Sequence, residues 1–311
     1  AGMGWGDVVL EARGCLMAGA EARAKAREAG TRACEAEPGR ARVTFRRALR
    51  SEAVRMRRSP LVVLHVALAV ALGALAGAYF AFSAWDSLLG TDAFFQLLGA
   101  GAPLLAGISC GLAADAEQRA GEGANVLGVS SRRGALAAKL AALLALCLMA
   151  AAIAAALFCG ALALAGRSLP DTAAVALATA GIALGSLCSY AILWCVALRF
   201  GRNASIGMGT LGFIAALTLM GGLANGLVTG TFSGAFSIGA AAFVPFAWPS
   251  RLASLPLELS IAAGMGAQAQ VEALAAAYAT VTCACTAITA VVLAVTLAAA
   301  NRFENPRRGG E

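Results

Sequence analysis

The stretch LVVLHVALAVALGALAGAYFAFSAW, residues 61–85, contains no Asp, Glu, Lys or Arg. A bilayer core of roughly 30 Å requires about 20 apolar residues in a helix, so this stretch predicts a transmembrane helix. Strands of a membrane barrel would alternate apolar and polar residues over about ten positions, and no such alternation occurs. Across the 311 residues, 60% are hydrophobic and 13% charged, against about 25% charged in soluble domains. We therefore expect an all-α polytopic membrane protein.

Six apolar stretches are long enough to cross a bilayer, and they organise the chain. They cover residues 61–85, 93–114, 140–166, 173–198, 205–228 and 271–300. With six spans, 22 of the 24 Lys and Arg residues fall on one side, and only Arg167 and Arg251 on the other. Because basic residues stay in cytoplasmic loops, both termini are expected to be cytoplasmic. The net charge of +7 is thus an orientation signal and does not imply a nucleic-acid partner.

Two segments precede the first span. Residues 1–42 are rich in Ala, Glu, Arg and Gly and lack an apolar stripe, so we expect a poorly ordered extension. Residues 43–59, VTFRRALRSEAVRMRRS, predict a cytoplasmic interfacial helix, because four apolar side chains fall within about 80° of arc. A solvated basic run that only sets the topology is the alternative. The apolar stripe consists of Phe45, Leu49, Ala53 and Met56, and the polar surface includes Arg50 and Glu52.

The membrane domain is predicted to cover residues 60–302, followed by a cytoplasmic tail over 303–311. Between the fifth and sixth spans, residues 229–270 are too long and too apolar for a simple loop. Pro245, Pro249 and Pro256 predict two short apolar helices that are broken by prolines and dip into the outer leaflet. Trp248 and Arg251 suit the headgroup level. A seventh and an eighth span are the alternative, although each piece is shorter than about 20 residues.

The composition argues against an enzyme. The only histidine, His65, lies near the start of the first span, with no acid or nucleophile at a recognisable spacing. Seven of the nine cysteines fall inside predicted spans, where Cys usually packs as a small apolar residue. We therefore expect no catalytic residues, no metal site and no cofactor.

Driven transport would need a separate source of energy. Ion-coupled carriers place acids or lysines within the membrane, but the predicted apolar cores contain none, and Asp92 is among the acids at the outer ends. Neither Lys25 nor Lys139 belongs to a phosphate-binding loop of the form G-x-x-x-x-G-K-[ST]. Any ATP would be bound by a partner subunit. A passive pore is also compatible with this composition.

A polar segment separates the second and third spans. Its sequence is DAEQRAGEGANVLGVSSRRGALAAK, residues 115–139. Its mixed charges are typical of a contact that sets orientation and specificity, and its glycines permit sharp turns at both ends. We expect a short cytoplasmic helix here that docks onto another protein. The alternative is a solvated loop whose bases set the topology.

Two stretches together resemble a known family. FRRALRSEAVRMRRSPLVVLHVALAVALGAL (residues 45–75) and GLAADAEQRAGEGANVLGVSSRRGALAAKLAALL (residues 111–144) are similar to lantibiotic-protection (immunity) permeases of the ABC-2 transporter type. The six-span layout, the basic helix before the first span and the broken apolar helices support the same resemblance, which covers residues 43–302. The matching residues are Ser59, Pro60, His65, Glu117, Ser131, Arg132 and Lys139.

The resemblance implies a permease subunit that pairs with a second permease, either a paralogue or another copy of this chain. A dimer of ABC ATP-binding proteins would drive the complex. It would export a lantibiotic-like peptide from the bacterial plasma membrane and confer self-immunity, a form of antibiotic resistance. The residues implied in coupling to the ATPase are Glu117, Arg119, Glu122, Arg132 and Arg133.

Two other functions remain open at this stage. The first is an ABC-2 permease for another hydrophobic drug or lipid. The second is a structural membrane protein or a passive pore without transport coupling.

Overall fold

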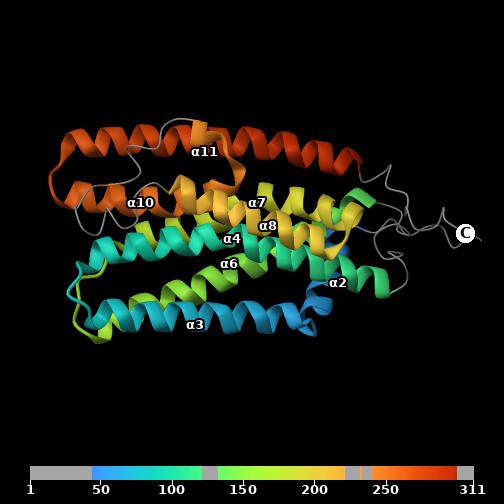
Figure 1. Cartoon of the computed structure of the whole chain (residues 1–311), viewed down its shortest axis with the longest axis horizontal. Helices are drawn as coiled ribbons and strands as arrows, with labels where there is room; N and C mark the ends of the chain where they lie inside the picture. Colours follow the sequence, from blue (N-terminus) through green and yellow to red (C-terminus); the bar gives the residue numbers. More distant parts are fainter. Residues whose placement is uncertain (1–43, 121–131, 221–231, 233–239, 300–311) are drawn as a thin grey trace, which may run out of the picture. The chain divides into compact units, whose positions relative to one another are not determined.

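The computed structural model describes residues 44–120, 132–220, 232 and 240–299 (Figure 1). The predicted extension over residues 1–42 and the tail over 303–311 therefore lie outside the described residues. Within the described ranges every regular element is helical and no strand occurs. The expectation of an all-α protein is thus confirmed for this part of the chain.

Among the described residues, five helices are long and apolar enough to cross a membrane. They are α3 (Pro60–Phe82), α4 (Ser87–Arg119), α6 (Arg132–Leu164), α7 (Thr172–Phe200) and α11 (Gln268–Ala299). They correspond to the first four and the last of the predicted spans, and identify a multi-pass membrane architecture. The fifth predicted span, 205–228, is represented by α8 (Arg202–Leu219), an 18-residue helix that is not among these five. Residues 221–228 of that prediction lie outside the described residues.

Side-chain caps explain where several helices begin. Ser59 accepts a hydrogen bond from the Leu61 amide at 3.2 Å, and Pro60 occupies the first position of α3. Asp86 caps α4 by accepting from two backbone amides, each at 2.9 Å. Asp171 caps α7 through the Ala174 amide at 3.1 Å. Asp86 and Asp171 are thus helix-capping residues.

Polar contacts identify the two ends of the helix assembly. At one end Ser87 donates to the Ser168 carbonyl at 2.9 Å, and Arg167 donates to the Trp85 carbonyl. These contacts join the turn between α3 and α4 to the turn between α6 and α7. The opposite end holds α2 (Phe45–Arg57), the start of α3 and α6, and the end of α4 (Figure 1). We call it the α2 end.

The α2 helix packs with a face different from the predicted apolar stripe. It covers Phe45–Arg57 within the predicted 43–59, and it contacts α6. Phe45 and Ala53 are exposed, whereas Glu52 and Arg55 are half-buried. At 100° per residue, the half-buried face is rotated by about 60° from the apolar stripe. The rest of this half-buried face is Ala48, Leu49 and Met56.

The segment before α11 differs from its prediction. Pro249 lies in the first turn of α10 (Trp248–Gly264) and Pro256 lies inside that helix without ending it. One 17-residue helix therefore replaces the two proline-broken helices, preceded by the 3-10 turns η2 (Ala240–Phe243) and η3 (Pro245–Ala247). Trp248 is fully buried, and its indole N–H donates to the Ala242 carbonyl at 2.8 Å. Trp248 and Arg251 are both buried among helices, and their predicted position at the headgroup level stays a prediction.

Glycines let α10 approach α4 and α7 at backbone distance. A Cβ atom at Gly99 of α4 would lie 2.5 Å from Ser250 Cα, and one at Gly185 of α7 would lie 2.8 Å from the Pro249 nitrogen. A Cβ at Gly181 would collide with the Leu252 carbonyl oxygen. Such small residues permit close helix packing in membranes, where no difference in apolarity drives association. The neighbours are backbone atoms, so they have no rotamer with which to yield.

Gly181→Ala is therefore expected to destabilise the protein by about 1–3 kcal/mol, because overpacking forces backbone shifts. Gly160→Ala provides the matched control, since a Cβ at Gly160 meets nothing within 4 Å. Unfolding of both purified variants in an SDS titration measures the difference. Equal midpoints for the two variants would contradict the close contact of α7 with α10.

Candidate functional site

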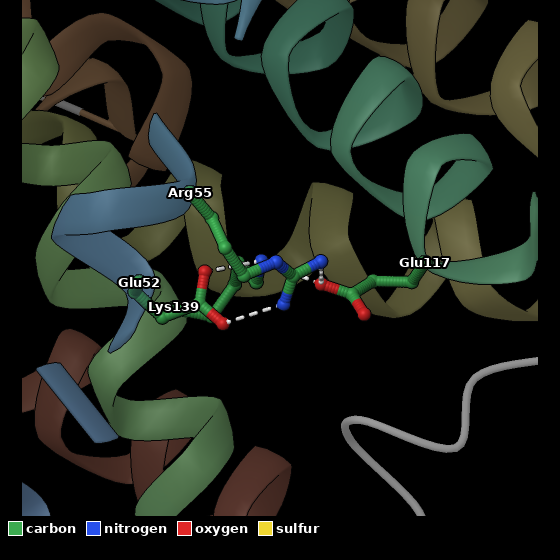
Figure 2. Close-up of polar contacts among 4 residues, drawn as sticks. All are labelled: Glu52, Arg55, Glu117 and Lys139. Carbon is green, nitrogen blue, oxygen red and sulfur yellow. Dashed lines mark hydrogen bonds and ion pairs between the residues drawn. The ribbon is translucent and has the colours of Figure 1, made fainter. Parts of the chain in front are cut away.

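Four ionisable side chains meet at the α2 end and form a closed ring of ion pairs (Figure 2). Lys139 Nζ of α6 lies 2.5 Å from Glu52 Oε2 of α2 and 2.7 Å from Glu117 Oε1 of α4. Arg55 of α2 reaches the same two carboxylates, with Nη1 3.0 Å from Glu52 Oε1 and Nη2 2.7 Å from Glu117 Oε1. Each acid thus contacts both bases. We call Glu52, Arg55, Glu117 and Lys139 the ion-pair ring.

The ring is largely removed from solvent. The exposed fraction of the side chain is 2% for Glu117, 6% for Lys139, 12% for Glu52 and 35% for Arg55. Burial of an ion costs several kcal/mol and is offset only when pairing is complete. Two carboxylates and two cations give the ring no net charge. This balance makes the buried arrangement tenable, and it makes each member necessary to the others.

Short-range sequence spacing places the members of the ring. Glu52 and Arg55 are three residues apart and therefore share one face of α2. Glu117 lies in the last turn of α4, and Lys139 lies two turns into α6. The turn at Ser59 and Pro60 then directs the chain from α2 into α3. The ring thereby fastens the short α2 to two long membrane helices.

The ring can transmit a displacement from one helix to another. Lys139 holds carboxylates from two different helices. Displacement of α2 or α4 therefore breaks at least two of the four ion pairs in the ring. A weaker link extends the network to α8, where Asp115 Oδ2 lies 3.4 Å from Arg202 Nη1 and 3.7 Å from Arg119 Nη2. These last pairs are more exposed, and such pairs contribute little to stability.

The residues predicted to couple to an ATPase lie in different environments. Glu117 is buried in the ion-pair ring and is not presented at the surface. The side chain of Arg119 is 78% exposed, Arg133 is exposed, and Arg132 is half-buried at the start of α6. Glu122 lies outside the described residues, as do all positions from 121 to 131. What the structure describes of segment 115–139 is the end of α4 and the beginning of α6, so the predicted short docking helix stays a prediction.

The residues predicted for the interfacial helix also separate into two groups. Leu49 and Met56 are half-buried, and Met56 packs against the hydrophobic core. Phe45 and Arg50 are exposed, with Phe45 at 49%. Glu52 belongs to the ion-pair ring.

A second buried polar cluster joins α4 to α10, and the sequence analysis missed it. Ser254 Oγ donates to Asp92 Oδ1 at 2.6 Å, and Gln96 Nε2 donates to Asp92 Oδ2 at 2.7 Å and to Ser254 Oγ at 3.1 Å. Arg251 and Glu258 lie within electrostatic range of Asp92. All five side chains are less than a tenth exposed. We call these residues the α4–α10 polar cluster.

This cluster places two acids inside the helix assembly. Asp92 is near the start of α4, but its side chain faces α10 and is 8% exposed. Glu258 is fully buried within α10. Arg251 donates to the Leu219 carbonyl, the last residue of α8, and so satisfies a C-terminal helix carbonyl. The spacing of residues 251, 254 and 258 along one helix face was the signal that could have revealed the cluster.

His65 occupies a satisfied structural position. Its Nδ1 lies 2.8 Å from the Leu61 carbonyl, so Nδ1 carries the proton. Its Nε2 is 3.3 Å from Ser109 Oγ, and the ring is fully buried between α3 and α4. Among the described residues, no three His, Cys, Asp or Glu side chains gather in a way that could hold a metal ion.

Comparison with known proteins adds no family assignment. No protein-family model, curated protein or solved structure matches the chain. The site is therefore interpreted from its own geometry.

Proposed function

We propose that this chain is the permease subunit of an ABC-2 type exporter that removes a lantibiotic-like peptide from the plasma membrane of a bacterium. A separate ATP-binding protein supplies the energy, and a second permease, either a paralogue or another copy, completes the pathway. The observation that carries the proposal is the ion-pair ring at the α2 end. The ring connects segment 115–139 mechanically to α2, α4 and α6.

The ring supports this function because it lies where force would enter. Segment 115–139 begins on α4 and ends on α6, and each of these helices contributes one member of the ring. A partner that displaced the segment would move Glu117 and Lys139 together. Through Glu52 and Arg55 the same displacement would reach α2, and through Pro60 it would reach α3.

The proposal also assigns the spans and their orientation. The α8 helix of 18 residues is about 27 Å long and serves as the fifth of the six spans. The α2 end faces the cytoplasm, because the helix-terminal bases Arg119, Arg132, Arg199 and Arg202 follow the bias of basic residues toward that side. Both termini are then cytoplasmic.

Arg133→Glu is expected to weaken co-purification with the ATP-binding protein encoded beside this gene by at least about tenfold, or roughly 1.4 kcal/mol. Arg133 is exposed on the first turn of α6, so the reversal leaves the ion-pair ring intact. Arg199→Glu makes the same charge change on α7 and provides the control. Detergent pull-down of the ATPase measures the effect.

Tolerance of a lantibiotic by the expressing bacterium supplies the functional readout. Inactivation of the partner ATPase should abolish tolerance, and Arg133→Glu should lower it while Arg199→Glu does not. Undiminished co-purification and tolerance in Arg133→Glu would exclude docking at this segment. Tolerance that persists without the ATPase would favour a passive membrane protein.

A further inference from the structure

The seam between α3 and α4 contains two adjoining openings of opposite character. Helix α3 packs extensively against α6 but only sparsely against α4. Along this loosely packed seam, a polar cavity lies at the α2 end and an apolar crevice lies deeper in the membrane-spanning part. Residues of α3 and α4 line both openings, so both openings lie along the same pair of helices.

The polar cavity has a volume of about 540 Å³ and an excess of positive charge. Four basic and two acidic side chains line it, and Glu117, which pairs with two of these bases, reduces the formal charge to +1. Arg55 and Lys139 are engaged in the ion-pair ring, whereas Arg58 is exposed and Arg119 has only a 3.7 Å contact with Asp115. The first turn of α3 also lines the cavity and carries no acidic residue. The cavity therefore favours an anionic group.

The apolar crevice has a volume of about 210 Å³ and is lined almost entirely by aliphatic side chains. On its α3 wall it runs from His65 to Leu72, and on its α4 wall from Leu97 to Ile108. At 1.5 Å per residue the α4 wall is about 16 Å long. Leu68, Leu72 and Leu97 are 39–47% exposed at its rim, so the crevice opens toward the lipid-facing surface.

The two openings are separated by a single helical turn. The cavity includes Leu61 of α3 and Leu112 of α4. The crevice begins at His65, four residues after Leu61, and at Ile108, four residues before Leu112. Four residues correspond to about 6 Å of helix. A positively charged compartment at the α2 end thus lies one helical turn from an apolar slot between the same two helices. This succession matches the headgroup and acyl chain of one phospholipid.

We propose that an anionic phospholipid binds in this seam, with its phosphate between Arg58 and Arg119 and one acyl chain in the crevice. Basic pockets between membrane helices recognise anionic headgroups by charge. The bound lipid fills the gap that α3 leaves against α4 and braces these helices beside the ion-pair ring. The site does not depend on the proposed export function, since it requires only the seam and its charges.

Native mass spectrometry of the full-length protein in detergent tests this site with phosphatidylglycerol and phosphatidylcholine of identical acyl chains. The wild type should retain phosphatidylglycerol preferentially. The double variant Arg58→Gln/Arg119→Gln should retain phosphatidylglycerol about thirtyfold more weakly, since each basic residue near a lipid surface contributes about one kcal/mol. Arg57→Gln/Arg133→Gln is the matched control, because it removes two exposed bases that do not line the cavity.

The acyl-chain part of the site is tested separately with Gly101→Leu. A Cβ at Gly101 meets nothing within 4 Å and the residue lines the crevice, so a leucine side chain at this position would occupy the crevice. This variant should lose both lipids, whereas Gly160→Leu, equally free of neighbours but on α6 away from the crevice, should retain them. Equal phosphatidylglycerol retention in the two arginine pairs, or in the two glycine variants, would overturn the proposal. Displacement of the lipid by millimolar inorganic phosphate would likewise reduce the site to a soluble-anion site.

Discussion

Lys139→Met is expected to lower the free energy of unfolding by about 3–5 kcal/mol, the range for removing one partner of a buried ion pair. The change leaves Glu52 and Glu117 with Arg55 as their only cation in the ion-pair ring. Glu117 is almost fully buried and cannot recover the lost interaction from water. Unfolding of the purified protein in an SDS titration measures the loss.

The double variant Lys139→Met/Glu117→Gln separates charge balance from packing. It leaves one acid and one base in the ring, so we expect it to be more stable than Lys139→Met alone. Arg133→Met removes an exposed cation from the same helix and should change stability by no more than about 0.5 kcal/mol. If the double variant lost the sum of both single losses, the ring would not act as a coupled unit.

The long membrane helices could be predicted because apolar length is a strong local signal. Residues 61–85 and 140–166 lack internal charges. The first of these predicted spans overlaps α3 and the second overlaps α6. Their ends were harder to predict, since polar residues continue two of the helices beyond the apolar stretch. α4 extends to Arg119 and α6 begins at Arg132, where charged side chains pair with neighbouring helices instead of marking a loop.

The polar sites could be predicted only in part. Glu52, Glu117 and Lys139 were singled out by type and by resemblance, but their mutual contact depends on how three helices pack. The sequence pattern therefore suggested surface roles for residues that the structure buries. The prolines predicted a break within α10 that does not occur, because Pro249 in the first turn is compatible with a helix and Pro256 is accommodated within one.

The two polar clusters have a common physical role. The ion-pair ring fastens α2 to the membrane helices, and the α4–α10 polar cluster fastens α10 to α4. At 13 residues α2 is too short to span the bilayer, and α10, at 17 residues, is at the lower limit of the range of about 17–25 residues for a span. Directional polar contacts thus fix the short helices, while apolar packing fixes the long ones.

Asp92→Leu is expected to destabilise the protein by about 3–5 kcal/mol, comparable to the loss at Lys139. Leucine removes the acceptor of the hydrogen bonds from Ser254 and Gln96, at 2.6 and 2.7 Å, and one of the two carboxylates that interact electrostatically with Arg251. Buried donors left without an acceptor cost about 1–3 kcal/mol each, and a buried charge costs more. Asp92→Asn keeps one acceptor oxygen, so its loss should be smaller than that of leucine.

Asp171→Leu is the matched control, because Asp171 is an exposed cap of α7 whose loss should cost only about 1 kcal/mol. SDS unfolding should therefore rank the variants Asp171→Leu, then Asp92→Leu, in increasing loss. Equal losses would contradict the burial of Asp92 against α10. Peptide tolerance in a stable Asp92→Asn variant adds the functional test: retained tolerance assigns the cluster to helix fixation, whereas lost tolerance assigns the carboxylate to transport, since intramembrane acids commonly mark such pathways.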